Sequence, residues 1–192
     1  RFYDGDTPDI SYDPEKAKAL LEESSYDGET IRILGLPYGE TWQRWAEAVK
    51  QNLSEIGMKS EIVPSDVAGW NQKVADRDFD LAFTYLYQYG DPALGVSRTY
   101  MGDNAAPGSP WNNVANYQNP ETDKLFAEAA LMASPEGRKA AYKEIQDAIV
   151  EDVPNIWLLE LGFPTIYRCD VKNPVNTAFG VNDGFRDVWL DK

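Results

Sequence analysis

The clearest pattern of hydrophobic and polar positions lies between residues 40 and 56, where apolar side chains recur every three or four residues. Charged residues occupy the other positions, which is typical of an amphipathic helix with one face on a core. Gly57 predicts the end of this helix, because glycine readily adopts the left-handed conformation of a helix C-cap. The apolar stripe consists of Trp42, Trp45, Ala46, Val49, Leu53 and Ile56.

Short apolar runs on either side of this helix predict β-strands over residues 31–34, 58–63 and 79–85. A second helix, capped by Ser65 or Asp66, is expected between the last two strands. The order of strand, helix, strand, helix and strand is typical of an α/β fold with right-handed crossovers. We therefore expect a mainly parallel sheet flanked by helices.

Three other helices share one kind of start, in which a side-chain acceptor at the N-cap precedes proline and glutamate. The acceptor binds free backbone amides and proline suits the first turn, so each motif predicts a helix N-terminus. The motifs begin at Asp13, Asn119 and Ser134. The last two predict a packed pair of helices over residues 120–133 and 135–152.

The chain after this helix pair is predicted to return to a sheet. Residues 155–161 are apolar almost throughout, as in a buried strand, and a strand over residues 165–169 is expected to pair with them. Cys169 has an apolar neighbourhood, so we expect a buried and unreactive thiol. Beyond Asp170 the sequence predicts an irregular carboxyl-terminal extension.

Composition and charge limit the classes of function. The 192 residues carry 32 acidic and 18 basic side chains, and a net charge of −14 repels phosphate backbones, so we expect no nucleic acid partner. The chain has no histidine, which excludes a Ser-His-Asp or Cys-His enzyme. A single cysteine excludes an intrachain disulfide and a multi-thiolate zinc site. Neither a metal nor a cofactor is expected.

Two features concern the polypeptide as a whole. No apolar run approaches the ~20 residues that a membrane-spanning helix needs. The chain begins at Arg1 without an initiator methionine or a signal-peptide pattern, so we expect it to be a piece of a longer protein.

The strand over residues 79–85 leads into a tyrosine-rich loop, which is the first candidate binding site. Small ligands of open α/β sheets collect just beyond the carboxyl ends of the strands. The tyrosines alternate at strand period, so their rings are expected on one face, where they either contact a ligand or pack along a sheet edge. The candidate ligand-binding residues of this loop are Tyr85, Tyr87, Gln88, Tyr89 and Asp91.

A long stretch rich in Gly, Pro, Asn and Ser follows and supplies the remaining candidates, Trp111, Asn112 and Asn113. Loops of this length in compact domains are usually functional or mobile. Trp111 is interpreted either as a cleft residue or as an anchor that pins the loop. The tryptophans on predicted helix faces are interpreted as packing residues, namely Trp42, Trp45 and Trp70.

Several motifs occur together in one order and cover about residues 10 to 165. They are YDPEKA at residues 12–17, LSEIG at 53–57, DFDLA at 78–82, NPETDKL at 119–125 and EDVP at 151–154, with Trp70, Arg138, Tyr142 and Gln146 between them. In this combination the chain resembles the carboxyl-terminal lobe of the ABC-transporter extracellular solute-binding proteins of family 5, the oligopeptide- and dipeptide-binding type.

The resemblance implies a two-lobed, non-enzymatic protein that closes on its ligand and delivers it to the transmembrane subunits of an ABC permease. Residues 1–169 would form the ligand-facing lobe, with the fold of a periplasmic binding protein. Residues 170–192 would be a tail that returns to the amino-terminal lobe, which this sequence lacks. The implied ligand is a peptide or a similar small polar solute. The implied location is the periplasm, or another extracytoplasmic location in which a lipid anchor attaches the intact protein to the membrane.

The chain departs from the family pattern in the tyrosine-rich loop. Relatives commonly carry a tryptophan and then an aspartate that pairs with the α-amino group of a peptide, at the places where this chain has Tyr85 and Gln88. A neutral glutamine cannot form that charge-assisted pair. Asp91 is a possible substitute three residues later, although an Asp-Pro dipeptide is also a turn signal.

Three other functions stay open at this point. An oligosaccharide, an opine or a metal complex is an alternative ligand for the same transport function, and stacking tyrosines with Trp111 suit a sugar. A glycosidase with two carboxylates needs no histidine, but no pattern in the sequence selects such a pair. A purely structural interaction module would explain the acidity and leave the aromatic loop without a purpose.

Overall fold

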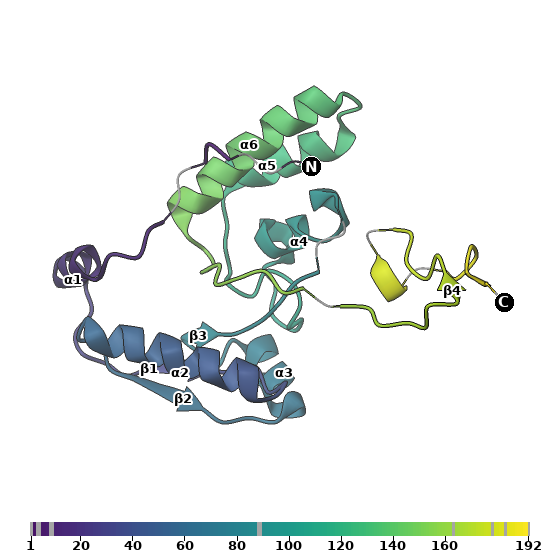
Figure 1. The fold of residues 1–192 in the computed structure, drawn as a ribbon. Helices are drawn as coiled ribbons and strands as arrows, with labels where there is room; N and C mark the ends of the chain where they lie inside the picture. Colours follow the sequence, from purple (N-terminus) through teal and green to yellow (C-terminus); the bar gives the residue numbers. More distant parts are fainter. Residues whose placement is uncertain are drawn as a thin grey trace.

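A small parallel sheet organises the first half of the chain (Figure 1). The sheet contains β1 (Ile31–Leu34), β2 (Ser60–Val63) and β3 (Leu81–Ala82) in the order β2-β1-β3, and both strand pairs are parallel. The structure is a computed structural model. It describes residues 2, 5–7, 10–87, 90–162, 164–177, 179–182 and 184–191. The predicted parallel sheet is confirmed.

Two helices connect these strands. α2 (Glu40–Glu55) joins β1 to β2 as predicted, and Gly57 follows its end in a left-handed conformation with φ 93°. α3 (Val67–Asp76) joins β2 to β3, and Asp66 caps it by accepting a hydrogen bond from the backbone amide of Gly69. The first crossover runs from β1 to β2, and the second runs back past β1 to β3. Because the two run in opposite directions across the sheet, the usual right-handed connection places the two helices on opposite faces.

The sheet and these helices enclose the first hydrophobic core. Trp70 is completely buried in it, and Trp42 and Trp45 pack against it partly buried, so the packing interpretation of all three is confirmed. Burying a large apolar side chain contributes about 1.5–3 kcal/mol, so this core accounts for much of the stability of the sheet. The buried residues are Ile33, Leu34, Leu36, Ala46, Trp70, Val74 and Phe83.

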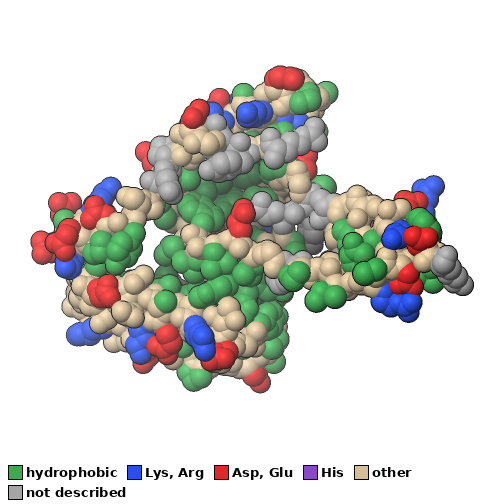
Figure 2. Space-filling model, viewed as in Figure 1, with side chains coloured by type: hydrophobic (Ala, Val, Ile, Leu, Met, Phe, Trp, Pro, Cys, Tyr) green, Lys and Arg blue, Asp and Glu red, His purple; other side chains and the backbone are tan. Residues whose placement is uncertain are grey.

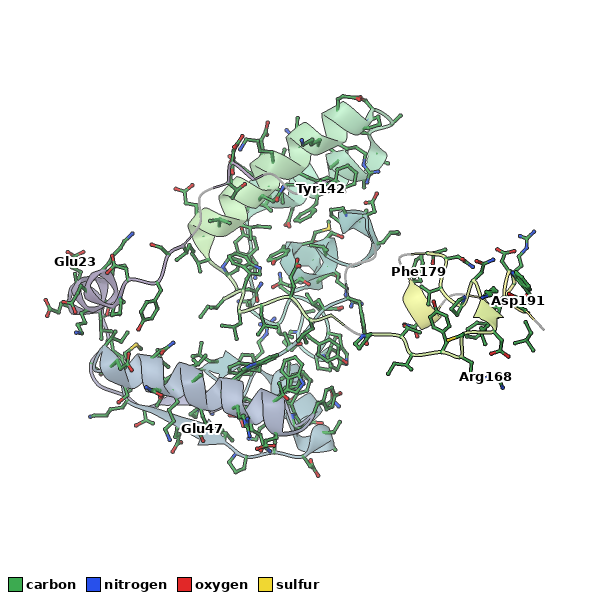
Figure 3. The ribbon with its side chains drawn as sticks, viewed as in Figure 1. Glu23, Glu47, Tyr142, Arg168, Phe179 and Asp191 are labelled. Carbon is green, nitrogen blue, oxygen red and sulfur yellow. The ribbon has the colours of Figure 1, made fainter. Side chains whose placement is uncertain are left out.

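The second core lies among the helices of the second half of the chain. α5 (Pro120–Leu131) and α6 (Pro135–Asp152) form the predicted pair, and the short helix α4 (Ser97–Tyr100) lies beside them (Figure 1). Tyr142 extends from α6 toward this core (Figure 3). The buried residues are Phe2, Tyr100, Phe126, Ala129, Ala141, Tyr142, Ile145 and Ile149.

The three predicted helix N-caps are confirmed. The side chains of Asp13, Asn119 and Ser134 each accept a hydrogen bond from a backbone amide in the first turn of α1 (Pro14–Glu23), α5 and α6. α1 has no buried residue and lies apart from both cores in Figure 1. This helix therefore begins where its capping signals predict although none of its residues is buried.

β3 is shorter than the predicted strand over residues 79–85. It aligns with β1 only as far as Ala82, which lies opposite Leu34, the last residue of β1. One further hydrogen bond follows, from the backbone amide of Phe83 to the carbonyl of Leu34 at 2.9 Å. Because β1 ends there, the chain leaves the sheet after Phe83 and begins the tyrosine-rich loop.

The predicted strands over residues 155–161 and 165–169 are not formed, because no described strand lies beside either segment. The apolar side chains of residues 156–161, the exposed apolar segment, face solvent instead, with exposed fractions from 39% for Leu161 to 66% for Ile156. Cys169 is also exposed, so the prediction of a buried thiol is wrong. An extended apolar segment that is about half exposed is therefore a feature of the described chain.

The last residues extend away from both cores (Figure 1). They contain β4 (Val171–Lys172) paired antiparallel with β5 (Trp189–Leu190), and a short 3-10 helix η3 (Gly180–Asn182) between them. This arrangement matches the predicted irregular extension. None of the described helices combines the length and the apolar character that crossing a membrane requires.

Candidate ligand-binding site

The carboxyl ends of the three parallel strands meet at one edge of the sheet, and the loops that leave this edge carry tyrosines. In the order β2-β1-β3 the chain turns from β1 toward β2, whereas β3 lies on the other side of β1, so the loops after β1 and β3 diverge. Open α/β sheets usually bind small ligands at such a switch point. Tyr38 follows β1, and Tyr85 and Tyr87 follow β3.

Five of the described aromatic residues form one cluster at this edge, which we call the aromatic wall. Tyr85 is its centre, because its ring centroid lies 6.1 Å from that of Tyr38, 5.7 Å from Trp42, 5.6 Å from Tyr87 and 6.1 Å from Trp111. The rings are tilted or edge to face, the geometries that aromatic pairs favour. The wall therefore joins side chains from two strand loops, from α2 and from the long loop before α5.

The aromatic wall has a packed base and an exposed rim. At the base, Trp111 packs on the core residue Trp70 with 5.2 Å between ring centroids, and Tyr85 is half-buried. At the rim, Tyr38 and Tyr87 are 41% and 44% exposed. Figure 2 shows hydrophobic side chains gathered on the face between the helix pair and the sheet. Exposed rings on a fixed base suit the binding of a small molecule with an apolar face.

The Tyr85 hydroxyl, at the centre of the wall, is uncharged at neutral pH. Burial raises the pKa of the Tyr85 hydroxyl above its ordinary value of 10.0, and the neighbouring hydroxyls of Tyr87 and Tyr38 raise this pKa further. A neutral phenol both donates and accepts hydrogen bonds. The wall therefore presents apolar ring surface together with at least one neutral polar group.

The structure brings together three of the predicted site residues, namely Tyr85, Tyr87 and Trp111. Trp111 contacts both Tyr85 and the core, so the cleft and anchor interpretations describe two sides of the same ring. Gln88 and Tyr89 lie outside the described residues.

Asp91, the predicted partner for a ligand ammonium group, is already paired. Its carboxylate oxygens both lie 2.6 Å from Nη2 of Arg138, a residue of α6. It also accepts a hydrogen bond from the backbone amide of Ala93 at 3.0 Å and so caps the 3-10 helix η1 (Pro92–Leu94). The structure therefore gives Asp91 a role in holding the loop.

Asn113, another predicted ligand contact, is placed inside the protein rather than at the wall. It is 1% exposed, and its side-chain amide donates to the carbonyls of Met101 and Tyr117 while its oxygen accepts from the backbone amide of Tyr117. A buried amide engaged in this way fixes the loop from within. Asn112 is half-buried beside Trp111.

The acidic pair of the β3 region lies at the opposite, amino-terminal edge of the sheet. Asp80 accepts hydrogen bonds from the backbone amide of Arg32 at 2.7 Å and from its guanidinium at 3.2 Å, and Asp78 bonds to Lys73 and to Arg32. The bond from Lys73 does most to lower the pKa of the Asp78 carboxyl, and the bonds from Arg32 do most to lower that of Asp80. These two carboxylates are ionised and hold β1 to β3.

No group of three or more His, Cys, Asp or Glu residues is placed to hold a metal ion in the part of the chain that the structure describes.

Sequence reasoning missed two members of the aromatic wall, Tyr38 and Trp42, as contributors to the site. Tyr38 lies four residues after the end of β1 and Tyr85 lies three residues after the end of β3, so a tyrosine soon after each of two parallel strands was an available signal. Trp42 lies on the apolar stripe of α2, and its contact with Tyr85 depends on where that helix packs. No pattern along the chain indicates that contact.

Comparison with known proteins places this chain among transport proteins. The sequence profile described as bacterial extracellular solute-binding proteins, family 5 Middle, matches residues 2–136. Over 196 residues the chain is 29% identical to Heme-binding protein A of Haemophilus influenzae, an alignment that covers 98% of this chain and 35% of that protein. Over 194 residues it is 25% identical to Peptide transport periplasmic protein SapA of Salmonella typhimurium, covering 99% of this chain and 35% of that one.

Solved structures share the fold. The crystal structure of the ABC transporter substrate binding protein CtaP of Listeria monocytogenes aligns with a TM-score of 0.70 and 25% identity, covering 79% of this chain and 30% of that one. The fold predicted for a periplasmic binding protein lobe is thereby confirmed. The chain spans about a third of the length of the curated relatives it matches.

Proposed function

The chain belongs to the bacterial extracellular solute-binding proteins of family 5, and from this premise we propose that it supplies one wall of the ligand site in the substrate-binding component of an ABC importer. Proteins of this family bind their solutes without chemical conversion, so the chain is a binding protein and not an enzyme. Family membership therefore removes the glycosidase interpretation.

The observation that supports the proposal most directly is the position of the aromatic wall. It lies beyond the carboxyl ends of β1 and β3, where the topology of an open sheet leaves room for a ligand. Its rim is exposed although its base packs on the core. The two exposed tyrosines leave apolar ring surface in contact with water, which is unfavourable. A bound solute would cover this surface.

We assign residues 1–169 to the ligand-facing lobe of a two-lobed protein and residues 170–192 to a tail that returns to the other lobe. Two observations favour this division. The chain matches only about a third of each curated relative, and the exposed apolar segment has the composition of a buried strand. A second lobe would cover this segment and close over the aromatic wall, burying both faces of the ligand.

The proposed ligand is a peptide or a similar small polar solute, captured outside the cytoplasmic membrane and delivered to permease subunits. Relatives carry names that state peptide transport and heme binding, so membership of the family alone does not select one ligand. An oligosaccharide or opine-like solute is the alternative. The neutral residue at position 88 and the engagement of Asp91 with Arg138 favour this alternative.

The proposal is tested by native mass spectrometry of the full-length protein that carries this chain, purified without denaturation. We expect a non-covalent adduct that tandem fragmentation identifies as a small polar solute. The matched control is the same protein unfolded, dialysed and refolded, which should lose the adduct and regain it from a cell extract. An intact protein that never carries or acquires a solute would contradict the proposal, and so would turnover of a chromogenic glycoside.

A further inference from the structure

Two side chains bind the same peptide group at the start of the long loop before α5. The backbone amide of Gly102 donates a hydrogen bond to Oδ1 of Asp123, in the first turn of α5, at 2.8 Å. The carbonyl of this peptide group belongs to Met101, and it accepts a hydrogen bond from Nδ2 of Asn113 at 3.1 Å. α5 and the later part of the loop are therefore joined through the peptide group between residues 101 and 102.

The contact between Gly102 and Asp123 requires glycine at position 102. A Cβ atom there would lie 2.8 Å from Oδ2 of Asp123, closer than Cβ atoms come to an oxygen in folded proteins. The φ angle of Gly102 is outside the left-handed region, so a residue with a side chain could adopt this backbone conformation. The requirement for glycine therefore comes from the side chain of Asp123.

The loop over residues 102–118 connects the two hydrophobic cores. Met101 and Tyr117, at its two ends, pack against the second core. Trp111 and Val114, in its middle, pack against the first core. The loop is therefore held at its ends by one core, while its middle contributes to the other.

Asn113 connects the peptide group to Trp111, which lies two residues before it in the chain. The Asn113 side chain is 1% exposed, so water does not replace a lost partner. Because buried polar groups need a partner, the Asn113 amide and the carbonyl of the peptide group have to face each other. The position of Trp111 against Trp70 and Tyr85 therefore depends on the orientation of one peptide group.

We propose that Asp123 is a positioning residue of the ligand site: by fixing this peptide group, it holds Trp111 in the aromatic wall. The inference rests on the proposed function in one respect, because that function makes the wall a ligand surface. Loss of the Asp123 carboxylate leaves the part-buried amide of Gly102 without its partner, so the peptide group turns toward water. Asn113 then loses its acceptor, and Trp111 moves away from Tyr85.

The test measures the near-ultraviolet circular dichroism of Trp111 in the full-length protein that carries this chain. The Trp111 band is the difference between a spectrum and that of the same protein with Trp111→Phe, and such a band is lost when a ring loses its fixed packing. Asp123→Ala should abolish the band. Asp123→Asn should rescue it, because an amide oxygen still accepts the bond from Gly102. Far-ultraviolet circular dichroism shows whether each variant is folded.

Gly102→Ala is a second route to the same loss, because the added Cβ atom has to displace Oδ2 of Asp123. Combined with Asp123→Ala, it should cause no further change, since that oxygen is already absent. Gly102→Ala also decides the question if Asp123→Ala does not fold. The matched control is Glu121→Ala, which removes an exposed carboxylate from the same turn of α5 and should retain the band.

Native mass spectrometry of the same variants measures binding as the fraction of protein that carries the adduct retained through purification. Asp123→Ala and Gly102→Ala should lower this fraction about fivefold, and Glu121→Ala should leave it unchanged.

A Trp111 band that persists in folded Asp123→Ala, or in Gly102→Ala, overturns the inference, as does an equal loss in Glu121→Ala. A lost band with an unchanged adduct fraction overturns the role of Asp123 in binding. A wild type without an adduct contradicts the proposed function instead, and the band still decides what positions Trp111.

Discussion

Asn113 fixes the loop behind Trp111 by hydrogen bonds that only a buried side-chain amide can make. It bridges Met101 and Tyr117, which lie on either side of it in the chain, through bonds of 2.7 to 3.1 Å. Each bond satisfies a backbone group that the loop shields from water. At the residue scale, the position of Trp111 in the aromatic wall thus depends on a buried neighbour, Asn113.

Replacing Asn113 with alanine should lower the free energy of unfolding by about 2 kcal/mol, because two carbonyls and one amide lose their buried partner. Urea denaturation followed by circular dichroism measures this change. Asn112→Ala is the matched control, since its side chain is half-buried and makes no hydrogen bond within the described residues, and it should change stability by less than about 0.5 kcal/mol. Equal effects of the two substitutions would contradict the role assigned to Asn113.

The residue types of the site could be read from the sequence, but their partners could not. Asp91 was identified as a charge in the candidate loop, and its pairing with Arg138 joins positions 47 residues apart through the packing of α6. The same applies to Asn113, a polar residue in a polar loop whose burial depends on how that loop folds back. Pairing of this kind is decided by tertiary structure, which local patterns do not encode.

At the scale of elements, helices were predictable because their signals are local. The caps at Asp13, Asn119 and Ser134 act within one turn of the residue that carries them. A strand forms only where a neighbouring strand can pair with it. β3 therefore ends where β1 ends. Residues 155–161 are extended and unpaired, although their composition suits a strand.

The exposed apolar segment leads to a prediction about self-association. In the 192-residue chain alone, Leu158 is 48% exposed within that segment, and contiguous exposed apolar surface favours association. Sedimentation velocity should show concentration-dependent association that Leu158→Asn reduces. Leu131→Asn is the matched control, because Leu131 is 88% exposed at the end of α5, outside the segment, and its replacement should leave association unchanged. A wild-type chain that stays monomeric at every concentration would count against this account.

At the scale of the whole molecule, two hydrophobic cores support one functional edge. The first core holds the sheet and the base of the aromatic wall, and the second holds the helix that carries Asp123. The parallel direction of the strands was predictable from the alternation of strands and helices, and it places the candidate loops at the carboxyl ends of those strands. The other wall of the cleft belongs to the proposed second lobe.

The central claim, that the aromatic wall contacts the ligand, is tested most directly by calorimetry of Tyr87→Ala in the full-length protein, with the solute that mass spectrometry identifies. Tyr87 is at the exposed rim, so its removal should weaken binding at least about tenfold and leave the fold intact. Tyr12→Ala, at a tyrosine that is 74% exposed and contacts Glu55, should bind as the wild type does. Unchanged affinity in Tyr87→Ala would contradict the claim.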